Sequence, residues 1–571
     1  MAFSLLHLSD LHSHVFPLRT RISATDAEHG LGTRGEWAEI AGLARLATLV
    51  RRERARAERS LLIDSGDAVE GAEVYDEFGG EVELAGLSRL GVEAQALGNH
   101  DLSAGGLAAF QRYQQFASFP VLAANYVADG SGGGFADVLS DSAWLSSSGL
   151  RVLVIGVGNV ASVSAFSLQE SGLGVVPRAA AQAVQSVIDR ARPDADFVVL
   201  ATHLGLADDI ALVEHTTGAD VVLGGHDHSL LDTPELAQDC GLELARERGC
   251  APRAVPIVHS GAYGKQLGVL ELTLSDLPED VGDPRDRFEI VSQRYRAVPA
   301  SSDVSEAPDL LELLSGFAPK EPADGGLIAY APAPLERFGV TGGDSALGNL
   351  LADALLDVLG TELSLFNSST LRADLPAGAL DETTLFEALP FDDAPVALWL
   401  SSAELEQIVA RAVERTARGE CRSALQIGGA RLELDCASSV FALRSLAGEC
   451  LAGSCGSHAP ARLFSLATTD YVASGGSGVL DPQHVTVAGR AEVSLREAVR
   501  RRLAALSPCT EPPGCSQELA AYLDARCQAP LRGSALGCSP AERSARAEQL
   551  CATLPCAVAR RDGRIELARE P

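Results

Sequence analysis

The sequence is poor in basic residues, and this shortage excludes whole classes of partner. Lysine and arginine number 46 against 77 aspartates and glutamates, so the formal net charge is -31 at pH 7. A field of that sign repels nucleic-acid polymers and anionic membrane surfaces. A small anionic substrate would therefore need a region of positive electrostatic potential, such as bound metal ions would provide.

Long apolar runs are also missing. No stretch approaches the roughly 20 apolar residues of a membrane-spanning helix, so no transmembrane segment is expected. The first apolar segment, residues 3–8, lacks the basic start, the long apolar core and the small-residue cleavage site of a signal peptide. It is expected to be a strand that leads directly into polar residues.

Cysteine does not occur before Cys240, and half of the 12 cysteines crowd into the last part of the chain: Cys509, Cys515, Cys527, Cys538, Cys551 and Cys556. An even number in a short tail, without paired CxxC motifs, favours disulfides over zinc fingers. We therefore expect a periplasmic or extracellular protein whose export signal is not included in this numbering. A cytoplasmic protein with reduced thiols is the alternative.

The 571 residues are long enough for two or three domains. Up to residue 300, helix-like stretches at 36–57 and 178–192 alternate with apolar strand candidates. Those candidates are 61–63, 152–155, 197–200, 221–223 and 257–258. The alternation predicts an α/β domain over 1–300. We expect a linker at 301–326, a second and smaller α/β domain at 327–500, and a Cys-rich extension at 501–571.

Five short motifs follow strand-like segments of the first region: "LSDLHSH", "LLIDSGDAVEG", "LGNHD", "VVLATHLG" and "GGHDHS". Together they offer seven candidate ligands, namely Asp10, His12, Asp67, Asn99, His203, His226 and His228. Ligands at the ends of parallel strands converge on one edge of a sheet. Nitrogen and oxygen donors without thiolate suit zinc, manganese, iron or cobalt. Seven ligands are too many for one ion and suit two.

The order of these motifs resembles the signature of the calcineurin-like metallophosphoesterases, and the second half narrows the resemblance to the 5′-nucleotidase family. There, "LGNLLADALLD", "FNSSTLRADLPAG", "FEALPF" and "TTDYVASGGSG" are similar to that family's C-terminal motifs, in its order. The similarity covers roughly residues 3–495. It implies a two-domain α/β fold, with a four-layer α/β/β/α metallophosphoesterase sandwich followed by a substrate-binding domain.

The resemblance also implies roles for single residues. One ion would be held by Asp10, His12, Asp67 and His228, and a second by Asp67, Asn99, His203 and His226, with Asp67 bridging. His100 would approach the phosphate and stabilise the transition state. The family usually places an aspartate three residues after this histidine, where this chain has Ser103. Without that carboxylate, His100 is expected to be less well oriented.

Nucleotide recognition in the family implies four further residues, Asn367, Arg372, Phe391 and Tyr471, with the two rings clamping the base. Two departures bear on specificity. Ser477 replaces the family's ribose-binding acid, and "VTGGD" lacks an arginine that several relatives carry there. Packing of an interdomain face is the alternative role for the two rings.

The sequence thus predicts a dinuclear phosphoester hydrolase acting on nucleoside 5′-monophosphates or related nucleotides. A 2′,3′-cyclic-nucleotide phosphodiesterase with 3′-nucleotidase activity is an alternative, and so is a non-catalytic protein stabilised by metal. The intact "GNH" segment speaks against the thiosulfate-processing relatives. Asp64 is expected to be a turn or supporting residue, and His14 a bystander. The remaining histidines are expected to be structural or on the surface: His7, His29, His215, His259, His458 and His484. Metal identity and oligomeric state stay open.

Overall fold

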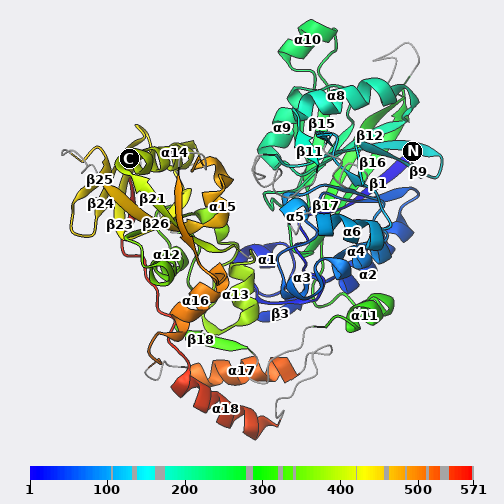
Figure 1. Cartoon of the computed structure of the whole chain (residues 1–571). Coiled ribbons are helices and arrows are strands. Elements are labelled where there is room, and N and C mark those ends of the chain that lie inside the picture. The colour runs from blue at the N-terminus through cyan, green and yellow to red at the C-terminus, as the bar shows by residue number, and fades with distance from the viewer. Residues whose placement is uncertain are drawn as a thin grey trace. The chain divides into compact units, whose positions relative to one another are not determined.

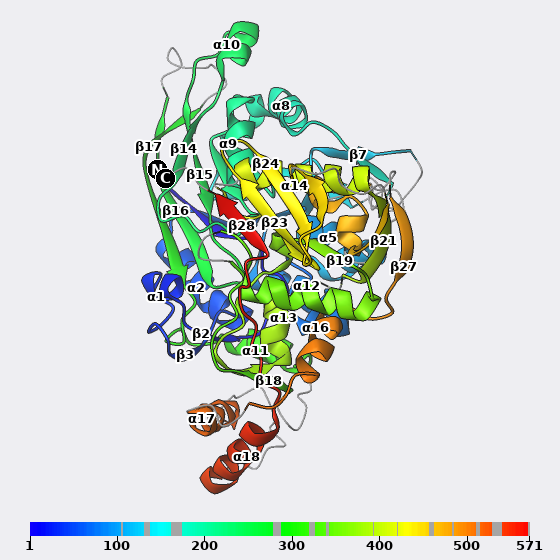
Figure 2. The same ribbon diagram turned by 90° about the vertical axis from the view of Figure 1, so that its left-hand side faces the viewer.

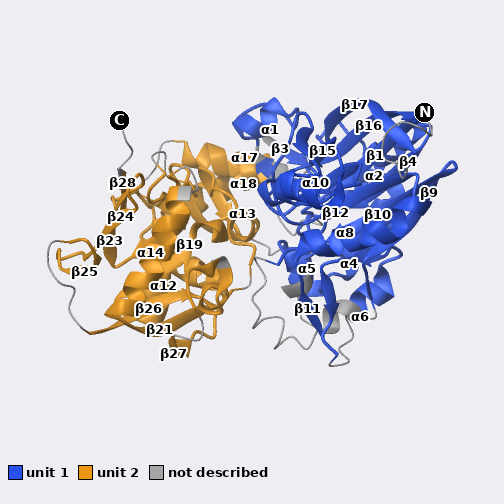
Figure 3. Cartoon of the chain, turned by 90° about the horizontal axis from the view of Figure 1, so that it is seen from above, with its two compact units in different colours: residues 1–318 blue, residues 319–571 orange. Residues whose placement is uncertain are grey.

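The computed structural model divides into two compact units, residues 1–318 and residues 319–571 (Figure 3). It describes residues 1–103, 107–130, 138–160, 174–277, 287–318, 326–338, 342–391, 393–418, 421–455, 462–481, 485–509, 514–527 and 539–568. Among these residues, no helix is long and apolar enough to cross a membrane. Each unit is described by itself below.

Unit 1 contains two large sheets. The first has the strand order β17 (Phe288–Pro299), β16 (Gln266–Asp276), β1 (Ala2–Leu8), β4 (Ser60–Asp64), β5 (Ala94–Ala96), β6 (Val121–Leu122) and β8 (Leu139–Ser140). The second has the order β14 (Glu235–Gln238), β15 (Ala254–His259), β13 (Val221–Gly224), β12 (Phe197–Thr202), β10 (Leu150–Val157) and β9 (Ser142–Ser147). Strands β1, β4 and β5 run parallel, as do β10, β12, β13 and β15.

Alternate residues of the central strands face two different apolar layers. In β1, Phe3 and Leu5 pack between the two sheets, whereas Leu6 and Leu8 face helices on the outer side. Both strand faces are therefore buried, which explains the continuous apolar runs in the sequence. Burial of each such side chain contributes about 1.5–3 kcal/mol.

Helices cover the outer faces of both sheets (Figure 1). The first sheet packs against α2 (Leu43–Arg56) and α4 (Glu81–Leu90), and α11 (Pro308–Ser315) packs against these two helices. The second sheet packs against α8 (Ala180–Ala191) and α9 (Leu206–Glu214). The layer order is α/β/β/α, as predicted. Helix α11 belongs to the segment expected to be a linker, yet its Leu310 and Leu314 are buried in the core of unit 1.

The smaller elements of unit 1 connect these layers. They are β2 (Leu18–Arg21), α1 (Ala24–Glu28), β3 (Trp37–Ile40), α3 (Glu73–Phe78), α5 (Asn99–Ser103), α6 (Leu107–Phe116), β7 (Tyr126–Ala128), β11 (Val175–Pro177) and α10 (Leu242–Arg248). Of these, α3 follows the loop after β4, and α5 follows the loop after β5. These two loops carry part of the site described below.

Unit 2 is a second α/β unit. Its five-stranded sheet has the order β22 (Leu425–Gly428), β19 (Leu363–Asn367), β26 (Leu463–Thr469), β21 (Pro395–Ser401) and β27 (Thr486–Arg490). Helix α14 (Ser402–Arg418) shares a core with Leu365 of β19, and α12 (Ala346–Leu359) shares another with the adjacent Phe366. Because neighbouring residues of a strand face opposite sides, the two helices cover opposite faces of this sheet.

A four-stranded sheet and several short elements complete unit 2. The sheet has the order β25 (Cys450–Gly453), β24 (Val440–Ser445), β23 (Ala430–Asp435) and β28 (Ile565–Ala568). The other elements are β18 (Leu327–Ala331), β20 (Gly378–Asp381), α13 (Glu382–Ala388), α15 (Asp470–Ala473), α16 (Leu495–Ala504), α17 (Cys515–Cys527) and α18 (Pro540–Thr553). Strand β28 runs beside β23 and parallel to it, so the Cys-rich segment returns to the sheet of unit 2 (Figure 2).

The disulfides expected from the cysteine pattern are present. Within the described residues they join Cys240 to Cys250, Cys421 to Cys436, Cys450 to Cys455, Cys509 to Cys556 and Cys515 to Cys551. The side chain of Cys527 and the whole of Cys538 lie outside the described part of the chain. The bridge between Cys515 and Cys551 joins helix α17 to helix α18, and the bridge between Cys509 and Cys556 joins the segment before α17 to the segment after α18. The domain boundaries given by the sequence stay predictions.

Candidate metal centre

The seven predicted ligands lie at the carboxyl ends of parallel strands from both sheets of unit 1. Asp10 and His12 follow β1, Asp67 follows β4, Asn99 follows β5, His203 follows β12, and His226 and His228 follow β13. Strand pairing fixes this common edge, because Leu8 lies opposite Asp64 in the first sheet and Thr202 lies opposite Gly224 in the second. Side chains far apart in the sequence therefore meet in one place.

Asp67 lies at the middle of the cluster and is buried. Its Oδ2 is 2.9 Å from His203 Nε2, 3.8 Å from His12 Nε2 and 4.0 Å from His100 Nε2. A single carboxylate thus contacts imidazoles from three different loops. This is the position that a bridging ligand between two cations requires.

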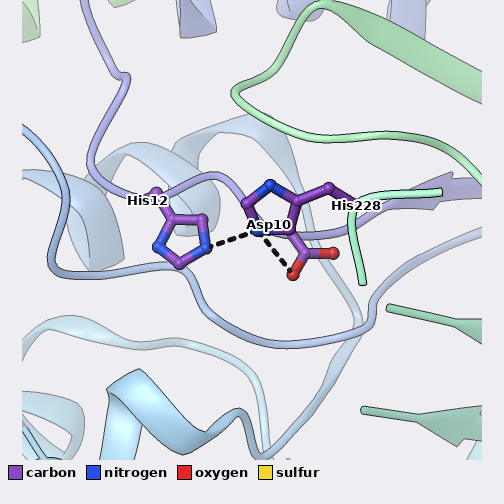
Figure 4. Close-up of side chains that lie close together, drawn as sticks. All are labelled: Asp10, His12 and His228. Atoms are coloured by element: carbon purple, nitrogen blue, oxygen red, sulfur yellow. Dashed lines mark hydrogen bonds and ion pairs between the residues drawn. The ribbon is translucent and has the colours of Figure 1, made fainter. Parts of the chain in front are cut away.

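On one side of Asp67, Asp10, His12 and His228 converge (Figure 4). His228 Nε2 lies 3.0 Å from His12 Nε2 and 3.6 Å from Asp10 Oδ1. Because His12 Nδ1 lies 2.8 Å from the carbonyl oxygen of Glu70, that nitrogen carries the proton and Nε2 of the neutral ring presents a lone pair. Two ring nitrogens facing each other at this distance need a proton or a cation between them.

On the other side, Asp67, His203 and His226 form a second group, in which the candidate ligand atoms lie within 4.8 Å of one another. Asn99 contacts this group through its Oδ1, which is 2.9 Å from His226 Nδ1. The Nδ1 of His203 donates to the carbonyl of Ser65 at 2.7 Å, so its Nε2 faces Asp67. Such bonds from the distal ring nitrogen are typical of metal-ligating histidines.

The electrostatics of the site favour a bound cation. Burial raises the pKa of Asp10 to about 6, although the imidazole of His203 opposes the rise. Burial acts in the same direction on Asp67, but His203 and His100 outweigh it and hold the pKa of that carboxyl well below its usual range. Burial alone would lower the pKa of His203, whereas the Asp67 carboxylate raises it to about 10. The buried carboxylates thus stabilise positive charge beside them.

Asp101, which sequence reasoning left without a role, holds the Asp67 loop in place. Its buried carboxylate accepts hydrogen bonds from the backbone nitrogens of Asp67 (3.0 Å), Ala68 (3.1 Å) and Gly98 (2.9 Å). At Gly98 a Cβ atom would lie 2.1 Å from Asp67 Oδ1, so only glycine permits this approach. No sequence signal marks this role, because all three bonds come from backbone groups.

The ligand loops adopt strained backbone conformations. Left-handed φ angles occur at Asp10 (51°), His12 (47°), Asp67 (53°), His226 (91°) and His228 (58°). Non-glycine residues in this region cost of order 1 kcal/mol or more each and persist where the surroundings determine them. Their concentration on three loops is typical of a functional site.

His100 lies at the rim of the cluster. Its backbone nitrogen donates to Asp67 Oδ1 at 2.8 Å, and its ring Nδ1 lies 2.8 Å from Glu70 Oε2. About 15% of its side chain is exposed, so a ligand can reach the ring. The contact with Glu70 was not foreseen from the sequence. The side chain of Ser103 lies outside the described residues.

The other polar residues near the strands have structural contacts. Asp64 accepts from Gly66 N and Gln95 Nε2, and burial raises the pKa of this carboxyl to about 8. His14 donates from Nδ1 to the carbonyl of His12, and His7 is buried against Ser65. His215 and His29 contact carbonyls of their own helices, and His259 pairs with Asp209. His458 and His484 lie outside the described residues.

The four predicted nucleotide-binding residues gather at one edge of the five-stranded sheet of unit 2. Strands β19 and β26 are parallel, and Pro395 at the start of β21 lies opposite Thr469 at the end of β26. Asn367 ends β19, and Tyr471 follows β26. Phe391 precedes β21, and the centre of the Phe391 ring lies 5.5 Å from the guanidinium carbon of Arg372. The side chain of Ser477 lies outside the described residues, as does the start of "VTGGD".

Comparisons with known proteins identify relatives of both parts of the chain. Residues 3–230 match the family model for calcineurin-like phosphoesterases, and residues 328–482 match the 5′-nucleotidase C-terminal domain. A 5′-nucleotidase of Diplobatis ommata is 24% identical over 504 residues, covering 83% of this chain and 82% of that protein. A snake venom 5′-nucleotidase of Crotalus adamanteus is 23% identical over 513 residues, covering 83% and 81%.

The fold is shared with a 5′-nucleotidase precursor from Thermus thermophilus, whose crystal structure gives a TM-score of 0.74 at 22% identity and covers 100% of both chains. Fold, ligand geometry and sequence matches together define a phosphoesterase, a class that uses divalent metal ions. The chain belongs to the 5′-nucleotidase family, which confirms the resemblance seen in the sequence.

Proposed function

We propose that the protein is a dinuclear-metal-dependent phosphoester hydrolase that removes phosphate from nucleoside 5′-monophosphates or related nucleotides. The observation that carries this proposal is the convergence of candidate ligands from four other loops around the Asp67 carboxylate, which contacts His203 at 2.9 Å. A purely structural site does not need a shared carboxylate with candidate ligands on both sides.

Asp10, His12, Asp67 and His228 would hold one ion, and Asp67, Asn99, His203 and His226 the other. Zinc, manganese, iron and cobalt all suit this donor set. When bound, such a pair of ions would polarise a phosphoryl group and would make water a better nucleophile at neutral pH. The rest of the reaction depends on side chains of this chain.

Among those side chains, His100 would bind the phosphoryl group at the rim of the site. Its ring is partly exposed, and its Nε2 faces Asp67 at 4.0 Å. A doubly protonated imidazole placed there can donate from Nε2 to phosphoryl oxygens, on which charge increases in the transition state, while its Nδ1 donates to Glu70. The bond from its backbone nitrogen to Asp67 fixes the position of the residue.

Unit 2 would supply recognition of the nucleoside. Phe391 and Tyr471 offer flat faces that stack on any base, and Asn367 and Arg372 offer hydrogen-bond donors. Arg372 is well placed, because its guanidinium lies over the ring of Phe391 and its backbone nitrogen bonds to the carbonyl of Ala388. Small nucleotides also agree with a chain of net charge -31, which repels polynucleotides.

We further propose a periplasmic or extracellular location. Five disulfides within the described residues support it, because such bonds persist in oxidising compartments. The snake venom relative is consistent with export.

The test is a metal-reconstitution panel on the full chain. Chelated protein is reloaded with zinc, manganese, iron or cobalt, and phosphate release is measured from nucleoside 5′-monophosphates, 2′,3′-cyclic nucleotides, nucleotide sugars and an aryl phosphate. Hydrolysis of the 5′-monophosphates with the highest kcat/KM is expected, and Asp67→Asn should abolish it. Asp208→Asn, which changes an exposed carboxylate of helix α9, is the matched control.

Other outcomes separate the alternatives. A preference for 2′,3′-cyclic nucleotides would favour the cyclic phosphodiesterase. No turnover of any compound with two ions bound would favour a non-catalytic metal-stabilised protein. The role of unit 2 is tested by Phe391→Ala, which should raise KM for nucleotides but not for the aryl phosphate; equal effects on both would refute base stacking.

A further inference from the structure

His100 has a carboxylate partner that does not come from the position where the family supplies one. The family's aspartate, three residues after the histidine, is Ser103 here. In the structure, Glu70 Oε2 lies 2.8 Å from His100 Nδ1. We propose that Glu70 is the positioning residue for His100 and replaces the missing aspartate from a different loop. The inference rests on the proposed function, because it concerns the same site.

The loop that carries Glu70 is fixed against the metal centre. Glu70 comes three residues after Asp67, and its carbonyl oxygen is 2.8 Å from His12 Nδ1. At the next residue, Gly71, a Cβ atom would lie 2.7 Å from His12 Cβ, so the backbone is in close contact with that ligand. Glu70 itself has a left-handed φ of 62°. The carboxylate is therefore presented by a constrained backbone.

The contact determines how the His100 ring is used. When Nδ1 donates a hydrogen bond to the Glu70 carboxylate, the orientation of the ring is set, and Nε2 faces the Asp67 side of the site. Only 15% of the His100 side chain and 19% of the Glu70 side chain are exposed. Partial burial limits screening by water, so the bond is stronger than an exposed ion pair.

The neighbouring acid does not perform this task. Asp101 is adjacent to His100 in sequence, but its oxygens accept from the backbone nitrogens of Asp67, Ala68 and Gly98. Asp101 and Glu70 thus have different functions. Asp101 holds the loop of the bridging carboxylate, and Glu70 orients the imidazole that would meet the phosphate.

The first test is Glu70→Ala in the metal-loaded full chain. We expect kcat to fall about 10-fold or more, while KM and metal content stay within about twofold of wild type. Metal content should persist because the bond from His12 goes to the backbone of residue 70, which the substitution keeps. Glu77→Ala, an exposed glutamate of helix α3, removes the same charge nearby and should leave kcat unchanged.

Two further variants separate positioning from general structural damage. In a His100→Ala background, Glu70→Ala should have no additional effect on kcat, because the two residues act as a unit. Ser103→Asp, which restores a carboxylate at i+3 on helix α5, should recover several-fold of the kcat lost in Glu70→Ala.

The proposal is overturned if Glu70→Ala keeps kcat within about twofold of wild type. It is equally overturned if the loss is as large in the His100→Ala background, or if Ser103→Asp recovers nothing. These failures differ from failure of the proposed function, which would appear as absence of phosphate release by the metal-loaded wild type. A wild type that is active, with His100→Ala impaired and Glu70→Ala unimpaired, would refute the Glu70 proposal alone.

Discussion

Replacement of Asp101 by asparagine tests whether the site depends on the residue that holds the Asp67 loop. The carboxylate accepts three backbone hydrogen bonds, with Oδ2 shared by Asp67 N and Gly98 N and Oδ1 taken by Ala68 N. An amide has the same shape but keeps only one accepting oxygen. Whichever way it is oriented, at least one buried N–H group faces an NH2 group instead of an acceptor.

The magnitude follows from these three bonds. A buried donor left without a partner costs about 1–3 kcal/mol. The bonds that remain lose their charge assistance, which is worth about 1 kcal/mol for each. Burial and the charge of Asp67 raise the pKa of Asp101, which means that the negative charge of Asp101 is unfavourable at this position. Removal of that charge therefore offsets part of the loss in stability. We expect Asp101→Asn to destabilise the metal-free protein by about 2–4 kcal/mol and to weaken metal binding about 10- to 100-fold.

The assay is urea unfolding of the chelated protein together with a calorimetric metal titration, in parallel with Asp208→Asn as an exposed control. The control should match wild type in both. If Asp101→Asn unfolds within about 0.5 kcal/mol of wild type and binds metal equally well, the three backbone bonds do not hold the site and the reasoning is wrong.

Three other predictions follow from buried charges and from metal linkage. Asp220→Ala should lower the free energy of unfolding by about 3–5 kcal/mol, because it removes the buried carboxylate that pairs with the buried guanidinium of Arg192. Asp189→Ala, from a more exposed ion pair, should cost less than about 1 kcal/mol in the same urea titration. Metal added at 100 times its Kd should raise the unfolding free energy of the chelated wild type by about 2.7 kcal/mol for each site that it fills, and an unchanged midpoint would contradict sites formed only in the folded state. Burial opposes protonation of His259, but the hydrogen bond to Asp209 helps to raise the pKa of this ring to about 9. This pKa lies above the unfolded value of 6.5, so the protonated ring contributes fully to stability below pH 6.5, and its contribution is lost as the pH rises towards 9. The stability difference between wild type and Asp209→Asn should therefore shrink over that range, and a constant difference would refute the assignment.

Local patterns in the sequence predicted the α/β character of unit 1 and the convergence of its loops, whereas the order of its four layers came from the family resemblance. Continuous apolar runs mark strands that are buried on both faces, and β12 and β13 formed where Phe197–Leu200 and Val221–Leu223 predicted them. Polar residues directly after such strands lie at one sheet edge. The seven predicted ligands therefore came together without knowledge of the sheet order.

What could not be predicted depends on loop conformation. Nothing in the spacing of Glu70 shows that its side chain reaches His100, since that contact requires a left-handed φ at residue 70 and the close approach of Gly71 to His12. The bonds of Asp101 likewise go to backbone groups, which have no sequence signal. The burial of Leu310 within the expected linker was missed because its Pro- and Ser-rich neighbours dominate the local composition.

The parallel pairing of β28 with β23 has a consequence for the order in which the chain acquires its structure during synthesis. Leu432 lies opposite Ile565, so a ribosome that has just completed β23 needs on the order of 10 s more to deliver its neighbour. Through that interval one side of β23 has no strand beside it. During this interval, a chaperone that covers exposed strand edges would protect the nascent chain most.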